Sequence, residues 1–152
     1  MRAFEEIEKN IDTVYKELTE SKQSSASLML ENNNEPYKEG IRFSPVPYGD
    51  RFRTLEFLSG GQRTIAALAL LFAIQRYKPS PFFVLDEVDA HLDSLGTSKL
   101  ARYIKGHSQV LQWLVISLND QFFSTADALV GVFKDKRREI SGTLTLDLTQ
   151  FV

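Results

Sequence analysis

One stretch that decides the fold is Phe82-Phe83-Val84-Leu85-Asp86-Glu87, a continuous apolar run that ends in two carboxylates. The run from Phe82 to Leu85 predicts a strand of a parallel sheet, because such strands are covered on both faces and carry apolar side chains without alternation. Ligands of open α/β sheets bind beyond the carboxyl ends of the strands. The stretch therefore predicts a buried strand with Asp86 and Glu87 at a functional edge of the sheet.

A second stretch, Leu58-Ser59-Gly60-Gly61-Gln62, stands before a long apolar segment. The segment from Ile65 to Ile74 is apolar at every position, which predicts a helix buried on all faces. Ala and Leu, which dominate it, are strong helix formers. Pro79 and Pro81 end this helix before the strand begins.

The N-terminal segment, residues 3–20, predicts a helix with an apolar seam. Its apolar residues alternate three and four positions apart, as in a coiled coil; they are Phe4, Ile7, Ile11, Val14 and Leu18. Two interpretations stay open: a surface helix packed on its own domain, or the last turns of a coiled coil that runs in from sequence outside this chain. We expect residues 1–20 to be the end of a coiled-coil helix and residues 21–152 to form the main body.

The sequence between these parts predicts a small antiparallel sheet. Leu28 and Leu30 indicate a short strand, the Asn- and Pro-containing stretch 31–36 a turn, and Ile41 and Phe43 the returning strand. Residues expected to break regular structure after it are Pro45, Pro47 and Gly49. Residues 51–57 then lead into the Ser-Gly-Gly stretch.

The remaining chain alternates helices and strands. The expected elements are a helix marked by Leu100, Tyr103 and Ile104 that stops at Gly106, a strand over 111–117, a helix over 120–128 with Asp120 as a possible cap, and strands over 129–133 and 140–148 joined by the charged turn 134–138. This order predicts an α/β layered body with a mostly parallel sheet, helices and a small antiparallel part. Leu144, Leu146 and Leu148 alternate with polar residues, so we expect them to pack on one face and leave the other wet.

Composition fits one globular domain of 152 residues, 43% of them hydrophobic. The net charge of -2 argues against a domain that acts mainly on DNA. The sequence has no cysteine, which excludes disulfides and thiolate metal sites. The longest apolar run is too short to cross a bilayer, and residues 1–6 lack the apolar core of a signal peptide. We expect a soluble intracellular domain.

The Ser-Gly-Gly stretch has two interpretations. Ser59 and Gln62 have the spacing of a capping box, which satisfies free amides at a helix start. A capping box leaves the two adjacent glycines unexplained, and glycine is costly at a helix start. Glycines let backbone amides approach an anion, and the helix N-terminus adds partial positive charge. The stretch therefore also predicts a site for a terminal phosphate.

The two carboxylates predict a magnesium nucleotide. Asp86 would hold Mg²⁺, directly or through water, and Glu87 would orient and polarise the attacking water. Asp93 before Ser94 has the alternative role of a helix cap. Neither His91 nor His107 has metal-ligand spacing. None of the 8 glycines is followed by lysine, so the chain lacks the phosphate loop that cradles ATP.

This combination resembles the ABC-type ATPases. Leu58-Ser59-Gly60-Gly61-Gln62 is similar to their signature motif, the stretch from Phe82 to Glu87 to their Walker B strand, and Ala90-His91-Leu92-Asp93 to their D-loop. A signature and Walker B separated from Walker A by a long coiled coil is typical of the structural maintenance of chromosomes (SMC) family and of Rad50-like repair ATPases. Flanking stretches that resemble the cohesin branch of the SMC family are 32–37, 51–53, 66–74, 77–90 and 115–118.

The resemblance implies a C-terminal lobe of an ATPase head, with ATP and Mg²⁺ as cofactors. In it, Ser59, Gly60 and Gly61 contact the γ-phosphate of ATP held by the opposing head, while Asp86 and Glu87 serve the ATP of their own head. Asp93 lies in the D-loop across the dimer interface. ABC ATPases often carry a switch histidine where this chain has Leu118, so Ser117 or a backbone group fills that role. His91 stands where family members often carry a small residue.

The resemblance also implies partners. They are the N-terminal Walker A lobe of the same protein, a second SMC head, the C-terminal winged-helix domain of a kleisin, and DNA through the assembled complex, with no membrane partner and a nuclear, chromosome-associated location. We expect Leu144, Leu146 and Leu148, in the C-terminal hairpin with Phe151 and Val152, to form the kleisin site. Two alternatives remain, a Rad50-like repair head and a non-catalytic docking module.

Overall fold

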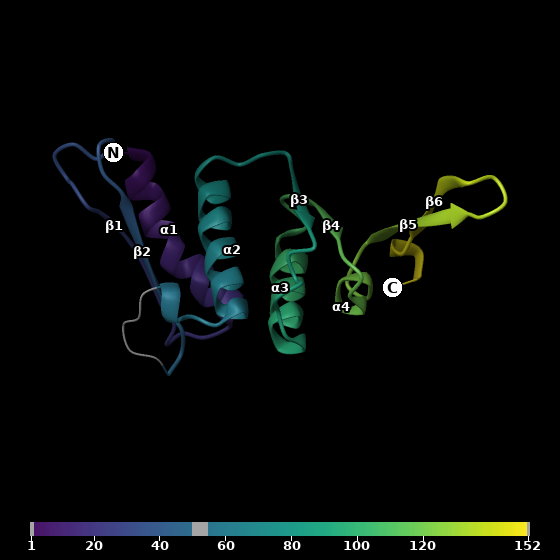
Figure 1. The fold of residues 1–152 in the computed structure, drawn as a ribbon, viewed down its shortest axis with the longest axis horizontal. Coiled ribbons are helices and arrows are strands. Elements are labelled where there is room, and N and C mark those ends of the chain that lie inside the picture. Colours follow the sequence, from purple (N-terminus) through teal and green to yellow (C-terminus); the bar gives the residue numbers. More distant parts are fainter. Residues whose placement is uncertain (1, 50–54, 152) are drawn as a thin grey trace.

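The computed structural model describes residues 2–49 and 55–151. Its elements are α1 (Arg2–Thr19), β1 (Ser25–Leu30), β2 (Ile41–Val46), the 3-10 turn η1 (Leu55–Phe57), α2 (Gly60–Tyr77), β3 (Phe82–Asp86), α3 (Ser94–His107), β4 (Gln112–Ile116), α4 (Asp120–Phe123), β5 (Ala128–Asp135), β6 (Ile140–Asp147) and the 3-10 turn η2 (Thr149–Phe151). They follow one another along an elongated body, with α1 and β1–β2 at one end and β5–β6 at the other (Figure 1). The expectations for residues 51–53 and for Val152 lie outside the described residues.

In the described ranges 2–49 and 55–151, the strands form three separate pairs. β1 and β2 pair antiparallel, β3 and β4 pair parallel, and β5 and β6 pair antiparallel. This confirms the α/β class with parallel strands, helices and a small antiparallel part. It also confirms that the apolar run at 82–85 is a strand of a parallel pair.

Helix α1 packs against α2 and β1. The C-terminal half of its apolar seam, Ile11, Val14 and Leu18, is fully buried in this chain. Phe4 and Ile7 are partly buried against the same core. The seam therefore serves as core in its last turns, and its continuation as a coiled coil stays a prediction.

The core is centred on Phe72 of α2, which is 1% exposed. Its ring stacks on Tyr103 of α3 at 5.1 Å between centroids and meets Phe83 of β3 and Trp113 of β4 edge-on at 5.8 and 5.2 Å. These four rings join α2 and α3 to one face of the parallel pair. Aromatic pairs in such arrangements stabilise a core beyond their buried area.

Two expectations of complete burial were wrong. Leu71 and Ile74 on α2 are 42% and 43% exposed, so that helix is not buried on every face. Likewise Val84 of β3 and Ile116 of β4 are 50% and 55% exposed, so the parallel pair is covered on one face only. The reason is that the described residues supply helices to one side of the pair and nothing to the other.

Smaller corrections concern element ends. Pro45 lies inside β2 and pairs with Ala26, which a proline tolerates because β2 has a neighbour on one side only. Helix α3 passes through Gly106 to His107. Helix α4 has one turn and ends at Phe123, and its N-cap is Asn119 rather than Asp120.

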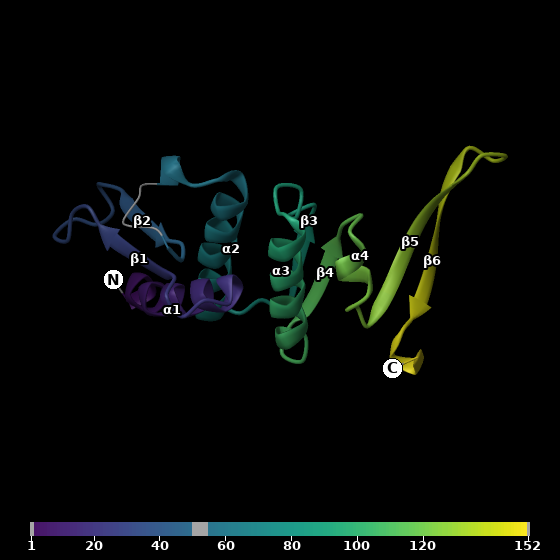
Figure 2. The same ribbon diagram turned by 90° about the horizontal axis from the view of Figure 1, so that it is seen from below.

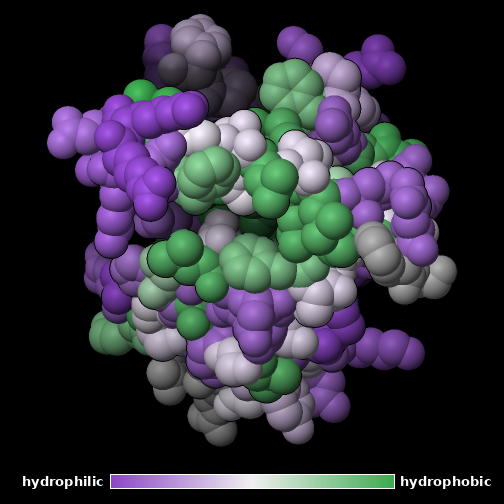
Figure 3. Space-filling view, turned by 90° about the vertical axis from the view of Figure 1, so that its right-hand side faces the viewer, coloured by the Kyte–Doolittle hydropathy of each residue, from purple (hydrophilic) through white to green (hydrophobic). Residues whose placement is uncertain are grey.

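The C-terminal hairpin stands away from the rest of the chain (Figure 2). Its antiparallel pairing is confirmed, and the strands extend to Asp135 and Ile140, so the connecting turn is shorter than predicted. Leu144 and Leu146 share one face of the hairpin with Leu129, as expected, and are 70% and 47% exposed, so that face is open to solvent and its use as a docking surface stays a prediction. Figure 3, which looks onto this end, shows apolar side chains gathered across the surface.

Candidate functional site: two glycines, a strained glutamate and the loop between them

The Ser-Gly-Gly stretch begins helix α2 as a complete capping box. The amide of Gln62 donates to the Ser59 hydroxyl at 3.2 Å, and the Ser59 amide donates to the Gln62 side-chain oxygen at 2.9 Å. The capping interpretation is therefore confirmed. Both side chains are used by the cap, so an anion at this turn would have to meet the backbone around Gly60 and Gly61.

Asp86 and Glu87 lie at the carboxyl end of β3, as expected. Asp86 is the last residue of the strand and is exposed. Glu87 has a φ of 48°, in the left-handed region that non-glycine residues seldom adopt. Its amide donates to the Ile116 carbonyl oxygen at 2.9 Å, which ties it to the end of β4. Backbone strain of this kind is often kept where a side chain must point in one direction for function.

The segment after Glu87 folds into consecutive turns. The Ala90 amide donates to the Glu87 carbonyl oxygen at 3.2 Å, and the Leu92 amide donates to the Asp89 carbonyl oxygen at 2.9 Å. Asp93 then caps α3, accepting a hydrogen bond from the Gly96 amide at 2.7 Å. The capping role of Asp93 is thus confirmed, while its role across an interface stays a prediction.

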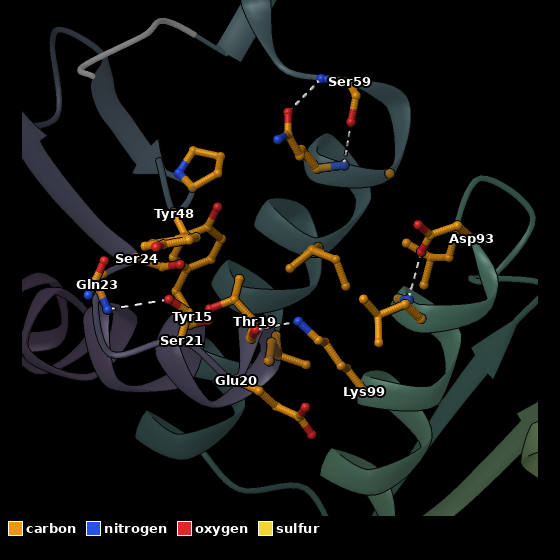
Figure 4. Close-up of a pocket in the computed structure, with 18 of the residues that line it drawn as sticks. Tyr15, Thr19, Glu20, Ser21, Gln23, Ser24, Tyr48, Ser59, Asp93 and Lys99 are labelled. Carbon is orange, nitrogen blue, oxygen red and sulfur yellow. Dashed lines mark hydrogen bonds between the residues drawn. The ribbon is translucent and has the colours of Figure 1, made fainter. Parts of the chain in front are cut away.

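The stretch 58–62, called the signature turn below, and the D-loop, residues 90–93, lie next to each other. A Cβ added at Gly61 would lie 3.1 Å from the His91 carbonyl oxygen, whereas one added at Gly60 would lie 3.9 Å from the His91 ring. Both segments border an open pocket of about 840 Å³ between the end of α1 and the starts of α2 and α3 (Figure 4). Asp86 and Glu87 do not line it.

The structure therefore separates two groups of predicted residues. One group surrounds the pocket and consists of Ser59, Gly61, Gln62, His91, Leu92 and Asp93. The other is the carboxylate pair at the end of β3. Leu58 belongs to neither, because its side chain is 3% exposed and is part of the core.

Ser117 and Leu118, the two residues at the switch position, have different surroundings. The Ser117 hydroxyl donates to the Asp89 carboxylate at 2.9 Å and accepts from the Asn119 amide at 3.0 Å. Leu118 is 94% exposed and its side chain is apolar. No sequence pattern predicted the Ser117–Asp89 contact, because the two residues are 28 positions apart and both types are common in loops.

A clamp on the C-terminus of α1 was also missed. Lys99 of α3 donates to the Thr19 carbonyl oxygen at 2.7 Å, and Arg102 donates to both carboxylate oxygens of Glu20 at 2.6 and 2.9 Å. The hydrogen bond from Arg102 lowers the pKa of the Glu20 carboxyl. Figure 4 shows Lys99 reaching toward Thr19 below the pocket. Basic residues on an amphipathic helix are usually solvated, so no pattern in the sequence identified this pair.

Within residues 2–49 and 55–151, no group of three or more His, Asp or Glu side chains gathers as a metal site. A Mg²⁺ ion that accompanies a nucleotide needs only one or two protein carboxylates, since phosphates and waters supply the other ligands. The exposed Asp86 carboxylate at the end of β3 fits that requirement. Of the helices in the described part of the chain, none is both long and apolar enough to span a membrane.

Comparison with known proteins shows the family of the chain. Residues 5–141 match the family described as RecF/RecN/SMC N terminal domain, and the chain belongs to that family. It is 49% identical over 155 residues to "Structural maintenance of chromosomes protein 1" of Schizosaccharomyces pombe, in an alignment that covers 99% of this chain and 13% of that protein. The chain thus spans about one eighth of the length of that relative.

Solved structures show the same fold. One is described as "Crystal structure of the SmcHead bound to the C-winged helix domain of ScpA"; it is 36% identical with a TM-score of 0.88, over 99% of this chain and 45% of that one. Another, from "Structural biochemistry of ATP-driven dimerization and DNA stimulated activation of SMC ATPases", is 36% identical with a TM-score of 0.86, over 99% of this chain and 89% of that one. The fold is therefore that of an SMC ATPase head.

Proposed function

We propose that the chain is the C-terminal lobe of an SMC ATPase head that acts in sister chromatid cohesion and chromosome organisation. One observation carries the proposal: the signature turn and the D-loop border one pocket, while Asp86 and Glu87 stand apart at the end of β3. This division suits a head in which the signature turn and the D-loop face the nucleotide of a partner head, whereas Asp86 and Glu87 face the nucleotide of their own head. Identity to the S. pombe relative supports the first SMC subunit of cohesin.

The assignment to the C-terminal lobe rests on the motifs. The matched family is described by its N-terminal domain, but this chain has a signature and a Walker B strand in that order and no glycine followed by lysine. An N-terminal lobe of the same protein would supply the phosphate loop. In this proposal the chain by itself neither binds ATP tightly nor hydrolyses it.

The exposed face of the parallel pair suits that N-terminal lobe. Val84 and Ile116 are half exposed there. Phe82 and Leu114 are also apolar and are 52% and 45% exposed. A sheet with one bare apolar face needs a covering layer. A lobe of the same protein would extend this sheet and cover its outer face.

In the completed head, each residue has a defined task. Asp86 would ligate Mg²⁺, which neutralises phosphate charge when ATP is bound. Glu87, whose backbone lies in the left-handed region, would hold and polarise the attacking water. The backbone of Gly60 and Gly61 would meet the γ-phosphate held by the second head, the third-type SMC subunit of cohesin.

The hairpin is the proposed kleisin site. The solved SMC head bound to the winged-helix domain of ScpA, a kleisin, shows that heads of this fold take such a partner. On this chain Leu144 and Leu146 form an exposed apolar face next to Phe133, and β5 and β6 pair only with each other. An exposed strand edge with apolar neighbours is a typical docking surface. DNA contact would come through the assembled complex, in the nucleus on chromosomes.

Two substitutions with opposite effects test the ATPase proposal in the full two-head complex. Glu87→Gln should keep ATP-dependent association of the heads and stop turnover, because the amide keeps the shape and loses the charge. Ser59→Arg should keep ATP binding to its own head and abolish association, because the side chain occupies the place of the partner's phosphate. Turnover near the unchanged rate in Glu87→Gln, or normal association in Ser59→Arg, would overturn the assigned roles.

The docking proposal has its own test. A double variant that carries Leu144→Glu and Leu146→Glu should abolish capture of a kleisin C-terminal fragment by the head. The matched control is a double variant on the opposite face that carries Thr143→Glu and Thr145→Glu. Circular dichroism checks that both variants are folded. Equal capture by the two double variants would place the kleisin elsewhere and leave the ATPase proposal intact. Equal capture would support neither the Rad50-like repair head nor the non-catalytic docking module.

A further inference from the structure

The D-loop, residues 90–93, and Asp89 directly before it contact two other parts of the chain. From one side, the Ser117 hydroxyl donates to the Asp89 carboxylate at 2.9 Å. That hydroxyl also accepts from the Asn119 amide at 3.0 Å. A serine hydroxyl has one hydrogen to donate, so Ser117 in this arrangement gives its hydrogen to Asp89 and not to a phosphate. The contact joins the end of β4 to the loop that follows β3.

From the other side, the D-loop lies against the signature turn. A Cβ added at Gly61 would stand 3.1 Å from the His91 carbonyl oxygen, closer than most Cβ contacts, so the neighbouring backbone would have to move by a few tenths of an ångström. The neighbouring Gly60 has ordinary space, with its nearest atom at 3.9 Å on the His91 ring. The two glycines are therefore not equivalent: a side chain at Gly61 would press on the D-loop backbone, and one at Gly60 would not.

We propose that Ser117 and Gly61 are positioning residues that clamp the D-loop within its own head, Ser117 through the Asp89 carboxylate and Gly61 through the His91 backbone. The inference rests on the proposed function, because the D-loop matters for turnover only if heads engage. The loop is fixed at its ends by the strained Glu87 and by the Asp93 cap. The two contacts hold Asp89 and His91, which lie among the five residues between those ends, so the loop faces a partner in one conformation.

The clamp also gives Ser117 a different task from a switch residue. A switch residue contacts the γ-phosphate directly, and its removal would act independently of Asp89. A positioning residue acts through Asp89, so its removal has no effect once Asp89 is gone. A double-mutant cycle separates the two cases, because additive effects mean independent actions.

The first experiment measures ATP turnover by the full two-head complex. Ser117→Ala should lower kcat about tenfold, the size expected for one hydrogen bond to a charged group, while KM for ATP stays unchanged. Ser117→Thr, which keeps the hydroxyl, and Asp89→Asn, which keeps an accepting oxygen, should retain most of the activity. In an Asp89→Ala background, Ser117→Ala should cause no further loss. Additive losses in that cycle, or full activity in Ser117→Ala, would overturn the Ser117 half of the proposal.

The second experiment needs no nucleotide. Amide hydrogen exchange at Leu92, whose amide donates to the Asp89 carbonyl oxygen, reports whether the turn is held. In the full protein without ATP, Ser117→Ala and Gly61→Ala should each speed this exchange, whereas Ser117→Thr and Gly60→Ala should leave it unchanged. Equal exchange in Gly61→Ala and Gly60→Ala would overturn the Gly61 half.

Failure of the proposed function would look different. If Glu87→Gln left turnover unchanged, the ATPase roles would fall, but the exchange measurement would still decide whether the loop is clamped. If the roles held and the exchange did not change, the clamp alone would fall.

Discussion

The apolar residues of two regions of this molecule, the core around Phe72 and the C-terminal hairpin, have opposite surroundings. Around Phe72 they come from α2, α3, β3 and β4 and leave Phe72 only 1% exposed. In the C-terminal hairpin they line up on one face by register, yet Leu144 is 70% exposed. The two regions have similar side chains and differ in whether this chain also supplies the covering layer. Exposed apolar side chains gathered on one face are typical of surfaces that a partner covers.

The largest expected effect tests whether the first region carries the stability. Phe72→Ala should lower the free energy of unfolding by about 3–5 kcal/mol, because it removes a large ring and leaves a cavity among three aromatic partners. Leu144→Ala should change it by less than about 0.5 kcal/mol, as expected for an exposed position. Urea unfolding of the two variants measures this. Similar losses in both would mean that the hairpin is as much a part of the core as Phe72.

A second effect tests whether the bare face of the parallel pair is an interface. Ile116→Asp should weaken association with an N-terminal lobe by at least about 2 kcal/mol, because a carboxylate would be buried without a partner. The stability of the chain alone should change little, since Ile116 is 55% exposed in it. Gln112→Asp, on the same face of β4 and exposed, is the matched control. Titration calorimetry of the two lobes gives both affinities, and unweakened binding in Ile116→Asp would contradict the assignment.

The smallest expected effect concerns acid stability, in which the Glu20–Arg102 pair and the hairpin residue Asp147 differ. The Arg102 hydrogen bond lowers the pKa of Glu20 below its ordinary value of 4.5, so this pair stabilises the fold above that pH and loses its effect as the pH falls through the lowered pKa. The hydroxyl of Thr149 lowers the pKa of Asp147 in the same direction, but that contact is local. Arg102→Ala should therefore reduce stability at pH 7 and leave it unchanged in strong acid, where Glu20 is protonated in both proteins.

Thermal melting from pH 7 to 2 follows this difference. Thr149→Ala, the control in the hairpin, should not alter the melting of the core at any pH. The effect of Arg102→Ala should be small, since the ion pair is exposed to solvent. A destabilisation that stays constant down to pH 2 would show that Arg102 acts through packing of its carbon chain instead.

Much of the fold followed from local pattern. The continuous apolar run at 82–85 predicted a parallel strand, the spacing of Ser59 and Gln62 predicted a capping box, and Asp93 before Ser94 predicted a helix cap. These features depend on a few neighbouring residues and on the alternation of apolar and polar side chains, so one chain is enough to show them. The same is true of the α/β class and of the antiparallel hairpin.

The mistakes have a common cause. A run such as 65–74 is apolar on all faces whether its cover is supplied by this chain or by another lobe, and the sequence of one lobe does not distinguish these cases. Burial was therefore predicted for Leu71 and Val84, which the structure leaves exposed. The end of α4 was predicted too late because a helix of one turn depends on its neighbours more than on its own residues.

The sequence by itself determined the motifs: a signature turn, a strand ending in Asp86 and Glu87, a D-loop and the lack of a phosphate loop. Tertiary structure alone decided which of these come together, placing Gly61 against His91 and Ser117 against Asp89 while Asp86 and Glu87 stay apart from the pocket. The physical reason is how far apart along the chain the interacting residues lie. Caps and strands arise from interactions over a few residues, whereas those contacts join residues 28 and 30 positions apart and exist only after α2, β3 and β4 have packed around Phe72.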